Sequence, residues 1–232
     1  MTAPDTTLID VLEGRRATYQ LLARLLRTEV DAEFLAALKA SRFPAATGNA
    51  KMDRGHRRIV SHLSRADADV LTELARDYTA TFIGSGNDGY SAAYPFESVY
   101  TSPKRLTMQD ARDEVLMLYR AAGLEKLESE KEAEDFIAYE LDFMAVLISR
   151  SLEALEKSDE ELAVSYLLQQ RNFLADHLCR WYPMMASDVQ KFAQTGFYRG
   201  VGELVEGFIA SDREFLDDLL EDVEDESDGA AA

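Results

Sequence analysis

The chain of 232 residues has few of the residues that interrupt helices or cross-link a fold. It contains 12 glycines, 5 prolines and 1 cysteine. Scarce glycine and proline favour helices, because both residues destabilise a helix interior. A single cysteine excludes an internal disulfide framework, which suits a reducing, cytoplasmic location. Cys179 lies in an apolar pattern, so we predict a buried structural thiol rather than a nucleophile.

Basic residues are scarce relative to acidic ones. Lys and Arg number 25 against 43 Asp and Glu, which gives a net charge of −18. Binding to nucleic acid needs a basic surface, so this balance predicts no nucleic-acid partner and favours a basic peptide or protein patch. The chain ends in EDVEDESDGAAA, without apolar periodicity. We therefore predict a domain over 1–213, followed by a partly disordered acidic tail over 214–232.

Long apolar runs are also missing. No run of 18 apolar residues occurs, so the sequence predicts no membrane span and no stable membrane insertion. Arg15 and Arg16 precede apolar residues, as the paired arginines of a twin-arginine export signal do. However, Arg24 and Arg27 interrupt the apolar stretch and no small-residue cleavage site follows. Apolar side chains instead mark one face of a first helix: Leu8, Leu12, Tyr19, Leu22 and Leu26.

Apolar periodicity predicts helices along most of the chain. Pro183 is expected to end one helix and open the next, and Thr107 is expected to cap another. No alternating strand pattern of useful length is present. The sequence therefore predicts an all-α, single-domain bundle of roughly nine helices. The predicted ranges are 6–27, 31–40, 56–64, 67–84, 108–123, 133–155, 159–181, 183–195 and 197–221.

Motifs for catalysis are missing as well. The three histidines form neither the Glu-x-x-His pairs of di-iron bundles nor a zinc spacing. No phosphate loop, dinucleotide-binding turn or Gly-x-Ser-x-Gly elbow is present. GSGNDG at 84–89 is glycine-rich, but no strand precedes it and no suitably placed lysine follows. We predict no enzymatic activity, no metal site and no resident cofactor.

One predicted connection, 84–106, is long for a helical bundle, which favours a functional role. Its second part, SAAYPFESVYTSPKRL at 91–106, carries three aromatic residues and a single carboxylate, Glu97. Pro95 restricts Tyr94 to extended backbone conformations. Two interpretations stay open. The aromatic rings plug the core between helices, or they line a groove for an apolar peptide helix with Glu97 near its basic end.

Several segments resemble one protein family. YPFESVYTSPKRLTM at 94–108 resembles the signature segment of the TorD/DmsD/NarJ-type redox-enzyme maturation chaperones, and EAEDFIAYELDFMAVL at 132–147 resembles their second signature. LARDYTATFIG at 74–84 is similar to the helix before the first signature, and 173–209 is similar to the family's C-terminal region. The resemblance covers roughly residues 8–220 and is closer to the TorD/DmsD branch.

The resemblance implies an all-helical cytoplasmic chaperone. Such a protein binds the twin-arginine leader of a molybdopterin-containing oxidoreductase subunit and delays export until cofactor insertion and folding are complete. No covalent chemistry is implied. The leader-binding residues carried over from the two signatures and the preceding helix are Tyr78, Phe82, Tyr94, Pro95, Phe96, Glu97, Ser98, Tyr100, Asp135, Phe136 and Glu140.

One position departs from the family pattern, and two other functions stay open. Relatives often have Asp-His where this chain has Asp135-Phe136, so a titratable contact is absent here. The first alternative is a maturation factor that binds guanine nucleotide or the molybdopterin cofactor. The second is a helical scaffold or regulatory protein that acts through its acidic tail. A monomer and a helix-swapped dimer are both compatible with the sequence, with the glycine-rich stretch 84–92 as a hinge.

Overall fold

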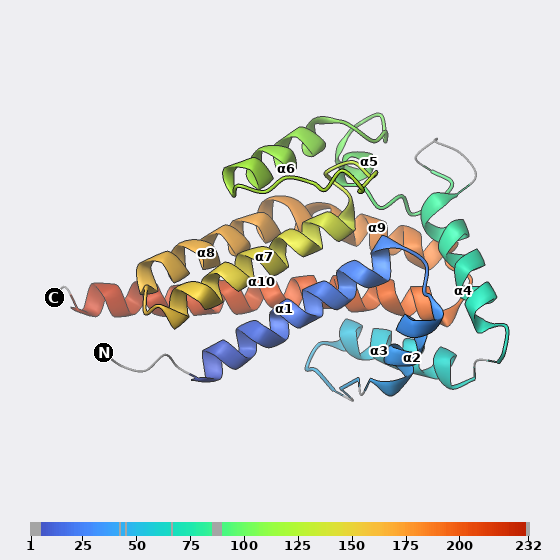
Figure 1. Ribbon diagram of the computed structural model, residues 1–232, viewed down its shortest axis with the longest axis horizontal. Coiled ribbons are helices and arrows are strands. Elements are labelled where there is room, and N and C mark those ends of the chain that lie inside the picture. Colours follow the sequence, from blue (N-terminus) through green and yellow to red (C-terminus); the bar gives the residue numbers. More distant parts are fainter. Residues whose placement is uncertain (1–5, 42, 45, 66, 85–89, 231–232) are drawn as a thin grey trace.

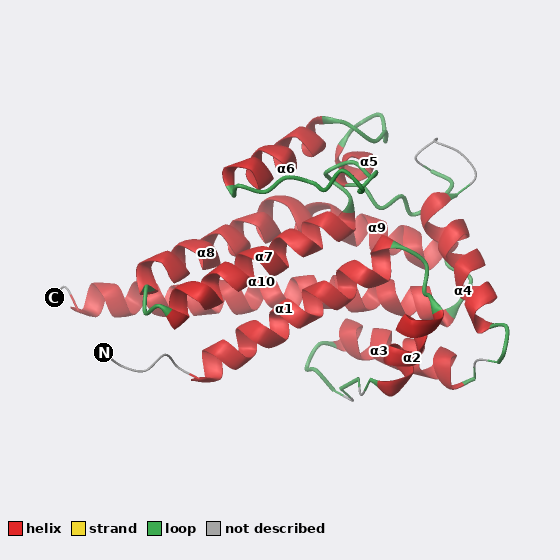
Figure 2. Cartoon of the chain, viewed as in Figure 1, coloured by secondary structure: helices red, strands yellow, loops and turns green. Residues whose placement is uncertain are grey.

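The computed structural model describes residues 6–41, 43–44, 46–65, 67–84 and 90–230 (Figure 1). These residues form ten α-helices and two π-helical turns, and none of them belongs to a strand (Figure 2). The predicted all-α fold is thus confirmed. The elements are α1 (Thr6–Arg27), α2 (Ala32–Ala40), α3 (Ala50–Ser64), α4 (Val70–Tyr78), η1 (Thr79–Ile83), α5 (Glu97–Thr101), α6 (Asp110–Ala121), α7 (Ile137–Glu156), α8 (Glu160–Phe173), η2 (Leu174–Leu178), α9 (Cys179–Phe192) and α10 (Gly196–Ala230).

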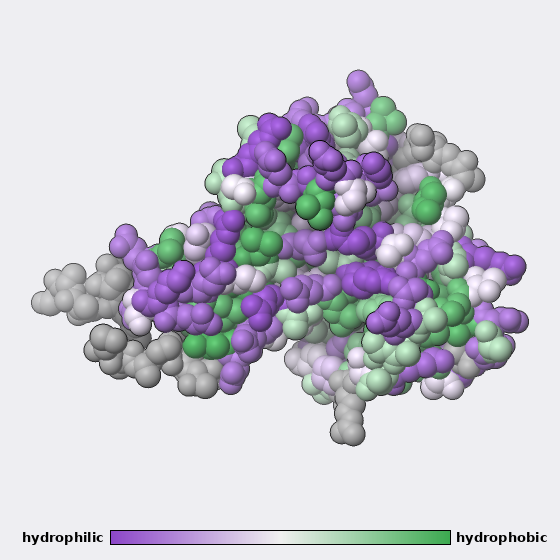
Figure 3. All heavy atoms as spheres, in the orientation of Figure 1, coloured by the Kyte–Doolittle hydropathy of each residue, from purple (hydrophilic) through white to green (hydrophobic). Residues whose placement is uncertain are grey.

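An elongated bundle forms the body of the molecule. Helix α1 packs on α7, α7 packs on α8, and the long α10 packs on α3, α8 and α9 (Figure 1). The short α5 and α6 lie together over one side of this body. The face seen in Figure 3 is mostly hydrophilic, with smaller apolar areas between. In the core, the largest fully buried side chains among the described residues are aromatic: Trp181, Tyr19, Tyr182, Tyr198 and Phe197.

The first helix is fixed to the last by a buried ion pair. The Arg15 guanidinium donates two hydrogen bonds to Asp212 on α10, at 2.5 and 2.9 Å. The Tyr19 hydroxyl donates a third to the same carboxylate, at 2.6 Å. Arg15 and Asp212 are 6% and 4% exposed. Arg15 therefore belongs to the folded core, in agreement with the prediction of a domain helix over 6–27.

Helices α3 and α10 approach each other closely where two glycines meet. A Cβ atom on Gly55 would lie 2.6 Å from the carbonyl oxygen of Gly200, and one on Gly200 would lie 2.7 Å from that of Gly55. Only residues without a side chain fit at this crossing. The same crossing brings Gly196, in the first turn of α10, close to Arg58 and His62 of α3.

Several predicted boundaries were wrong for local reasons. Helix α3 begins at Ala50 rather than 56, because the Asn49 side chain accepts hydrogen bonds from the backbone of Lys51 and Met52. The predicted non-helical segment 84–106 contains the short helix α5. The residue that precedes α6 is Gln109, not Thr107.

The C-terminal third also differs from the prediction. Helix α9 follows η2 directly and passes through Pro183, whose nitrogen cannot donate a helical hydrogen bond. Helix α10 continues to Ala230 rather than 221. Leu216 and Leu220, which follow the expected boundary at 213/214, are buried, and the division into a domain and an acidic tail stays a prediction. The predicted hinge, 84–92, lies largely outside the described residues.

Candidate functional site

The two signature segments meet in the structure. Phe96 and Phe136 form an isolated antiparallel bridge. The Glu97 amide donates to the Asp135 carbonyl at 3.0 Å, and the Ile137 amide donates to the Pro95 carbonyl at 2.9 Å. These bonds join the start of α5 to the start of α7. The two bridged residues, Phe96 and Phe136, are 40 positions apart in the sequence. The site is thus built where two helix starts face each other.

A groove of about 420 Å³ lies beside this junction. Six of the eleven predicted site residues line it, together with side chains from the end of α1, from η1 and from the connections before α6 and α7. The predicted residues in the lining are Tyr78, Phe82, Tyr94, Pro95, Phe96 and Phe136. The others are Arg27, Thr28, Glu29, Ile83, Thr107 and Glu132.

Aromatic rings form the walls of the groove. The rings of Tyr78 and Phe82 lie 5.1 Å apart, and those of Phe96 and Phe136 lie 5.4 Å apart. Phe96 is half-buried, whereas Phe136 is 3% exposed. The Tyr78 hydroxyl donates to the Leu26 carbonyl at 3.1 Å, which fixes that ring to the end of α1. The walls are therefore apolar and held in place.

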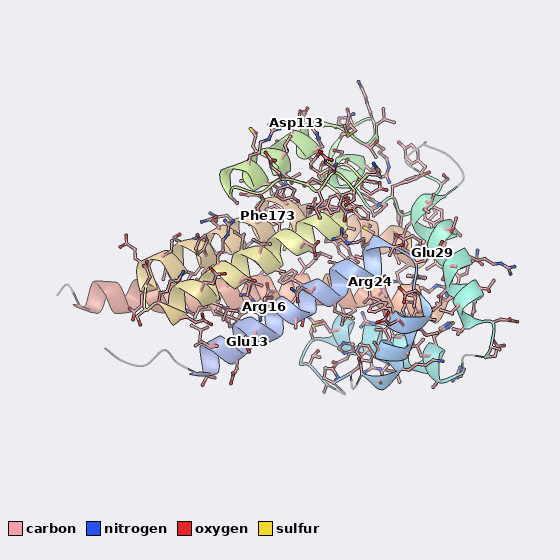
Figure 4. All side chains as sticks on the ribbon, in the orientation of Figure 1. Glu13, Arg16, Arg24, Glu29, Asp113 and Phe173 are labelled. Carbon is pink, nitrogen blue, oxygen red and sulfur yellow. The ribbon has the colours of Figure 1, made fainter. Side chains whose placement is uncertain are left out.

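The rim of the groove combines an exposed apolar side chain with carboxylates. Ile83 is 55% exposed, and Glu29 and Glu132 are exposed. Glu29 extends toward η1, where it accepts a hydrogen bond from the Thr79 hydroxyl at 3.4 Å (Figure 4). Burial first, and then the charges of Glu132 and Glu29, raise the pKa of Tyr78. Both carboxylates thus act on the wall of the groove.

Glu97 does not face the groove. It is 1% exposed, and its carboxylate lies 2.9 Å from Nδ1 of His177 on η2. The His177 ring in turn stacks on Phe173 of α8, with ring centres 4.9 Å apart. The expectation that Glu97 lies near the basic end of a bound peptide stays a prediction, and in this structure its carboxylate is paired with His177 in the core.

Glu140 lies in the same buried region. Its Oε2 accepts a hydrogen bond from the Trp181 indole at 3.0 Å, and the residue is fully buried. Burial first, and the nearby Glu97 carboxylate second, raise the pKa of Glu140 well above that of an ordinary carboxyl. Two carboxyl groups, an imidazole and an indole thus form a polar cluster under the junction, which we call the buried cluster (Glu97, Glu140, His177 and Trp181).

The three remaining predicted residues also point inward. Asp135 accepts a hydrogen bond from the Ser98 amide at 2.8 Å, and burial raises the pKa of Asp135. The Ser98 hydroxyl accepts from the Gln109 amide at 3.1 Å. The Tyr100 ring stacks on Trp181, with centres 5.7 Å apart. These residues hold the junction together and do not line the groove.

Sequence reasoning did not single out several residues that lie in the buried cluster or in the lining of the groove. His177 and Trp181 belong to the C-terminal region and complete the buried cluster. Ile83, Glu29 and Glu132 form the rim. Glu132 is the first residue of the second signature segment, and Ile83 closes the helix before the first, so their positions carried a weak signal. Nothing in the sequence near His177 indicated a partner 80 residues away.

The described part of the chain shows two further absences. No group of three or more His, Cys, Asp or Glu side chains within it could hold a metal ion. None of its helices is both long enough and apolar enough to cross a membrane.

Comparison with known proteins gives one consistent result. The family model described as nitrate reductase delta subunit matches residues 47–187, which include both segments of the junction. The chaperone protein TorD of Vibrio cholerae is 28% identical over 216 residues, which cover 90% of this chain and 95% of that protein. The chaperone protein TorD of Photobacterium profundum is 30% identical over 148 residues, which cover 64% and 66%.

Proposed function

The chain belongs to the family of the nitrate reductase delta subunit and the TorD-type redox-enzyme maturation chaperones, and from this premise we propose that it binds the twin-arginine leader of a molybdoenzyme subunit in the groove beside the junction. As a maturation chaperone, it would hold the leader until the subunit has received its cofactor and folded. Binding and release suffice for this task, and no covalent step is needed.

The observation that carries the proposal is the composition of the groove. A twin-arginine leader has a basic start followed by an apolar stretch. The groove has aromatic walls, which include Tyr78, Phe96 and Phe136. Its rim carries two exposed carboxylates, Glu29 and Glu132. In this proposal the apolar stretch of the leader packs on the aromatic walls, and its basic start lies near the carboxylates of the rim.

The two kinds of contact contribute differently. Burial of the apolar stretch against the rings supplies most of the affinity, at about 25 cal/mol for each Å² of apolar surface removed from water. The exposed carboxylates contribute orientation and association rate more than affinity, because solvent screens them. Replacement of the apolar stretch should therefore weaken binding more than replacement of the arginines.

The buried cluster supports the groove without touching the ligand. Glu97 and Asp135 bind the backbone and side chains that join α5 to α7. Phe96 and Phe136 follow directly from those segments and form one wall. The signature carboxylates thus act as positioning residues in this proposal.

Calorimetric titration of the full chain with synthetic twin-arginine leaders tests the proposal. We expect one leader to bind saturably, and a version with serines in place of its apolar stretch to lose at least about tenfold in affinity. If no twin-arginine leader from the molybdoenzymes of the source organism binds, the proposed function is wrong.

Variants of the groove then locate the binding site. Ile83→Asp changes an exposed rim residue, so the fold should survive while leader affinity falls by about tenfold or more. Met117→Asp, on α6 and 62% exposed, is the matched control and should bind the leader as the wild type does. Binding that is equally strong in both variants would place the leader elsewhere on the protein.

A further inference from the structure

A second hollow on the molecule is lined by arginines. It has a volume of about 670 Å³ and lies along α3, next to the start of α10. We call it the arginine cleft, after Arg54, Arg57, Arg58 and Arg65. The chain as a whole has 43 acidic residues against 25 basic ones. Four arginines around one hollow therefore form a local reversal of the protein's charge.

Part of this positive charge is not neutralised. Arg54 and Arg58 share Glu203 of α10, at 3.4 and 3.2 Å. The Arg57 and Arg65 side chains are exposed and make neither an ion pair nor a hydrogen bond with the described residues, although the charge of Arg57 acts on Asp53 one turn before it in α3. Two carboxylates, Asp67 and Glu73, lie at one edge of the cleft. The cleft thus presents two exposed guanidinium groups to a ligand.

The start of α10 lies in the cleft but is already capped. Gly196, the first residue of this helix, lines the cleft. The Tyr198 amide donates to the Thr195 hydroxyl at 3.3 Å, and the Asp77 carboxylate accepts from the Gln194 and Thr195 amides at 2.8 Å. The Ser61 hydroxyl on α3 is a hydrogen-bond donor in the lining. The arginines and this hydroxyl are the groups that favour an anionic occupant.

The arginines are spread out, which indicates an extended occupant. Arg54 and Arg65 are 11 positions apart, which is roughly 16 Å along a helix. One phosphate group cannot contact both ends of such a row, whereas a peptide with successive carboxylates can. The chain contains such a peptide: residues 221–228 read EDVEDESD, with six carboxylates at Glu221, Asp222, Glu224, Asp225, Glu226 and Asp228.

Cleft and acidic segment lie at opposite ends of the same helix. Helix α10 begins at Gly196 in the cleft and runs for 35 residues to Ala230, a length of roughly 50 Å. Figure 1 shows its C-terminal end at the far end of the molecule from α3. The acidic segment of a chain therefore cannot reach the cleft of that same chain. Two chains with antiparallel α10 helices would place each acidic segment at the other chain's cleft.

We propose that the arginine cleft binds the acidic segment 221–228 of a second copy of this chain, so that two copies form a closed dimer with two-fold symmetry. Each copy contributes one cleft and one segment, and no binding surface is left over for further growth. The groove beside the junction takes no part, so the dimer and the proposed leader binding succeed or fail independently.

Ionic strength should control this dimer in a characteristic way. The two copies each carry a charge of −18 and repel each other at long range. The screening length is about 10 Å at 0.1 M salt, which suppresses that repulsion but spares contacts between touching groups. At 1 M salt the length is about 3 Å, and the contacts themselves weaken. We expect the dimer to be most stable near 0.1 M salt and to dissociate at 1 M.

Sedimentation equilibrium of the full chain, over a range of concentrations at 0.1 M salt, tests the proposal. The wild type should pass from one to two chains as the concentration rises. Arg57→Glu with Arg65→Glu, and separately a chain that ends after Glu221, should each raise the dimer dissociation constant by at least about tenfold. Arg120→Glu with Arg180→Glu changes the net charge equally, outside the cleft, and should leave the constant near the wild-type value.

Complementation provides the decisive result. The truncated chain keeps its cleft, and the Arg57→Glu, Arg65→Glu chain keeps its acidic segment. A mixture of the two should form a mixed dimer, through one of the two contacts, at concentrations where each alone is monomeric. A wild type that stays monomeric, even if the cleft binds inorganic diphosphate, overturns the proposal. So does a truncated chain that dimerises like the wild type, or a mixture that forms no mixed dimer.

Discussion

The Glu97 carboxylate and the His177 imidazole lie 2.9 Å apart in the core, although 80 positions separate them in the sequence. They are 1% and 5% exposed. Removal of one member of a buried pair leaves the other without its partner, at a cost of about 3 kcal/mol. His177→Ala should therefore lower the free energy of unfolding by about this amount, as measured by urea denaturation at pH 7.

A double variant separates the lost partner from the lost volume. In Glu97→Gln with His177→Ala, no unpaired carboxylate remains, so the double variant should recover at least about 1 kcal/mol relative to His177→Ala alone. If the double variant is less stable than the single one, the two residues stabilise the fold separately and the pairing has no energetic role.

This pair shows where the sequence was informative and where it was not. The apolar spacing in 6–27 and 133–155 predicted helices, and the structure contains α1 and α7 (Ile137–Glu156) there, because a repeat near 3.6 residues depends on local geometry alone. The orientation of Glu97 depended on His177, which packs from another helix. Residue type and local spacing carry no record of such a contact, so the sequence left two positions open for Glu97: in the core between helices, or beside a peptide groove.

The same distinction applies to the rest of the site. The signature resemblance identified residues that the structure brings together, but it did not separate Phe96, which lines the groove, from Ser98, which is buried below it. Helix α5 begins directly after Phe96, and its first side chains, including that of Ser98, point into the core. The start of that short helix depends on hydrogen bonds to Asp135 in the second signature, which a linear reading does not reveal.

The Glu140 carboxyl should make stability depend on pH. Its pKa is raised in the folded protein by burial and by Glu97, so the fold favours the neutral form. The resulting stabilisation is present below the ordinary pKa of about 4.5 and is lost as the pH rises toward the raised value. Glu140→Gln stays neutral and keeps an acceptor for Trp181. Its free energy of unfolding, relative to that of the wild type, should therefore increase by about 1 kcal/mol or more between pH 5 and pH 8.

Denaturation series at pH 5, 6, 7 and 8 measure this difference. Glu114→Gln, at an exposed position of α6, is the matched control and should follow the wild type at every pH. A Glu140→Gln variant that runs parallel to the wild type over the whole range would show that Glu140 keeps its charge in the fold.

The crossing of α3 and α10 should not tolerate a methyl group. A Cβ on Gly200 would lie 2.7 Å from the Gly55 carbonyl oxygen and 2.9 Å from a side-chain carbon of Ile59. Gly200→Ala should therefore destabilise the fold by about 2 kcal/mol, despite the higher helix propensity of alanine. Gly14→Ala, in α1 with no atom within 4 Å of the new carbon, should stabilise it by up to about 1 kcal/mol. Thermal melts of both variants check the prediction, and equal shifts would contradict it.

The contact between Arg15 and Asp212 should hold α1 to α10 only as long as both groups are present. Arg15→Met leaves the Asp212 carboxylate buried with the Tyr19 hydroxyl as its remaining hydrogen-bond donor, and should cost about 3 kcal/mol. The combination Arg15→Met, Tyr19→Phe and Asp212→Leu removes every polar group of the cluster. Because a well-packed apolar replacement avoids the desolvation of buried charges, this triple variant should be more stable than Arg15→Met. Urea denaturation of the two variants measures this difference. If the triple variant is less stable than Arg15→Met, the prediction is wrong. The ion pair itself, rather than the absence of an unpaired charge, would then stabilise the contact.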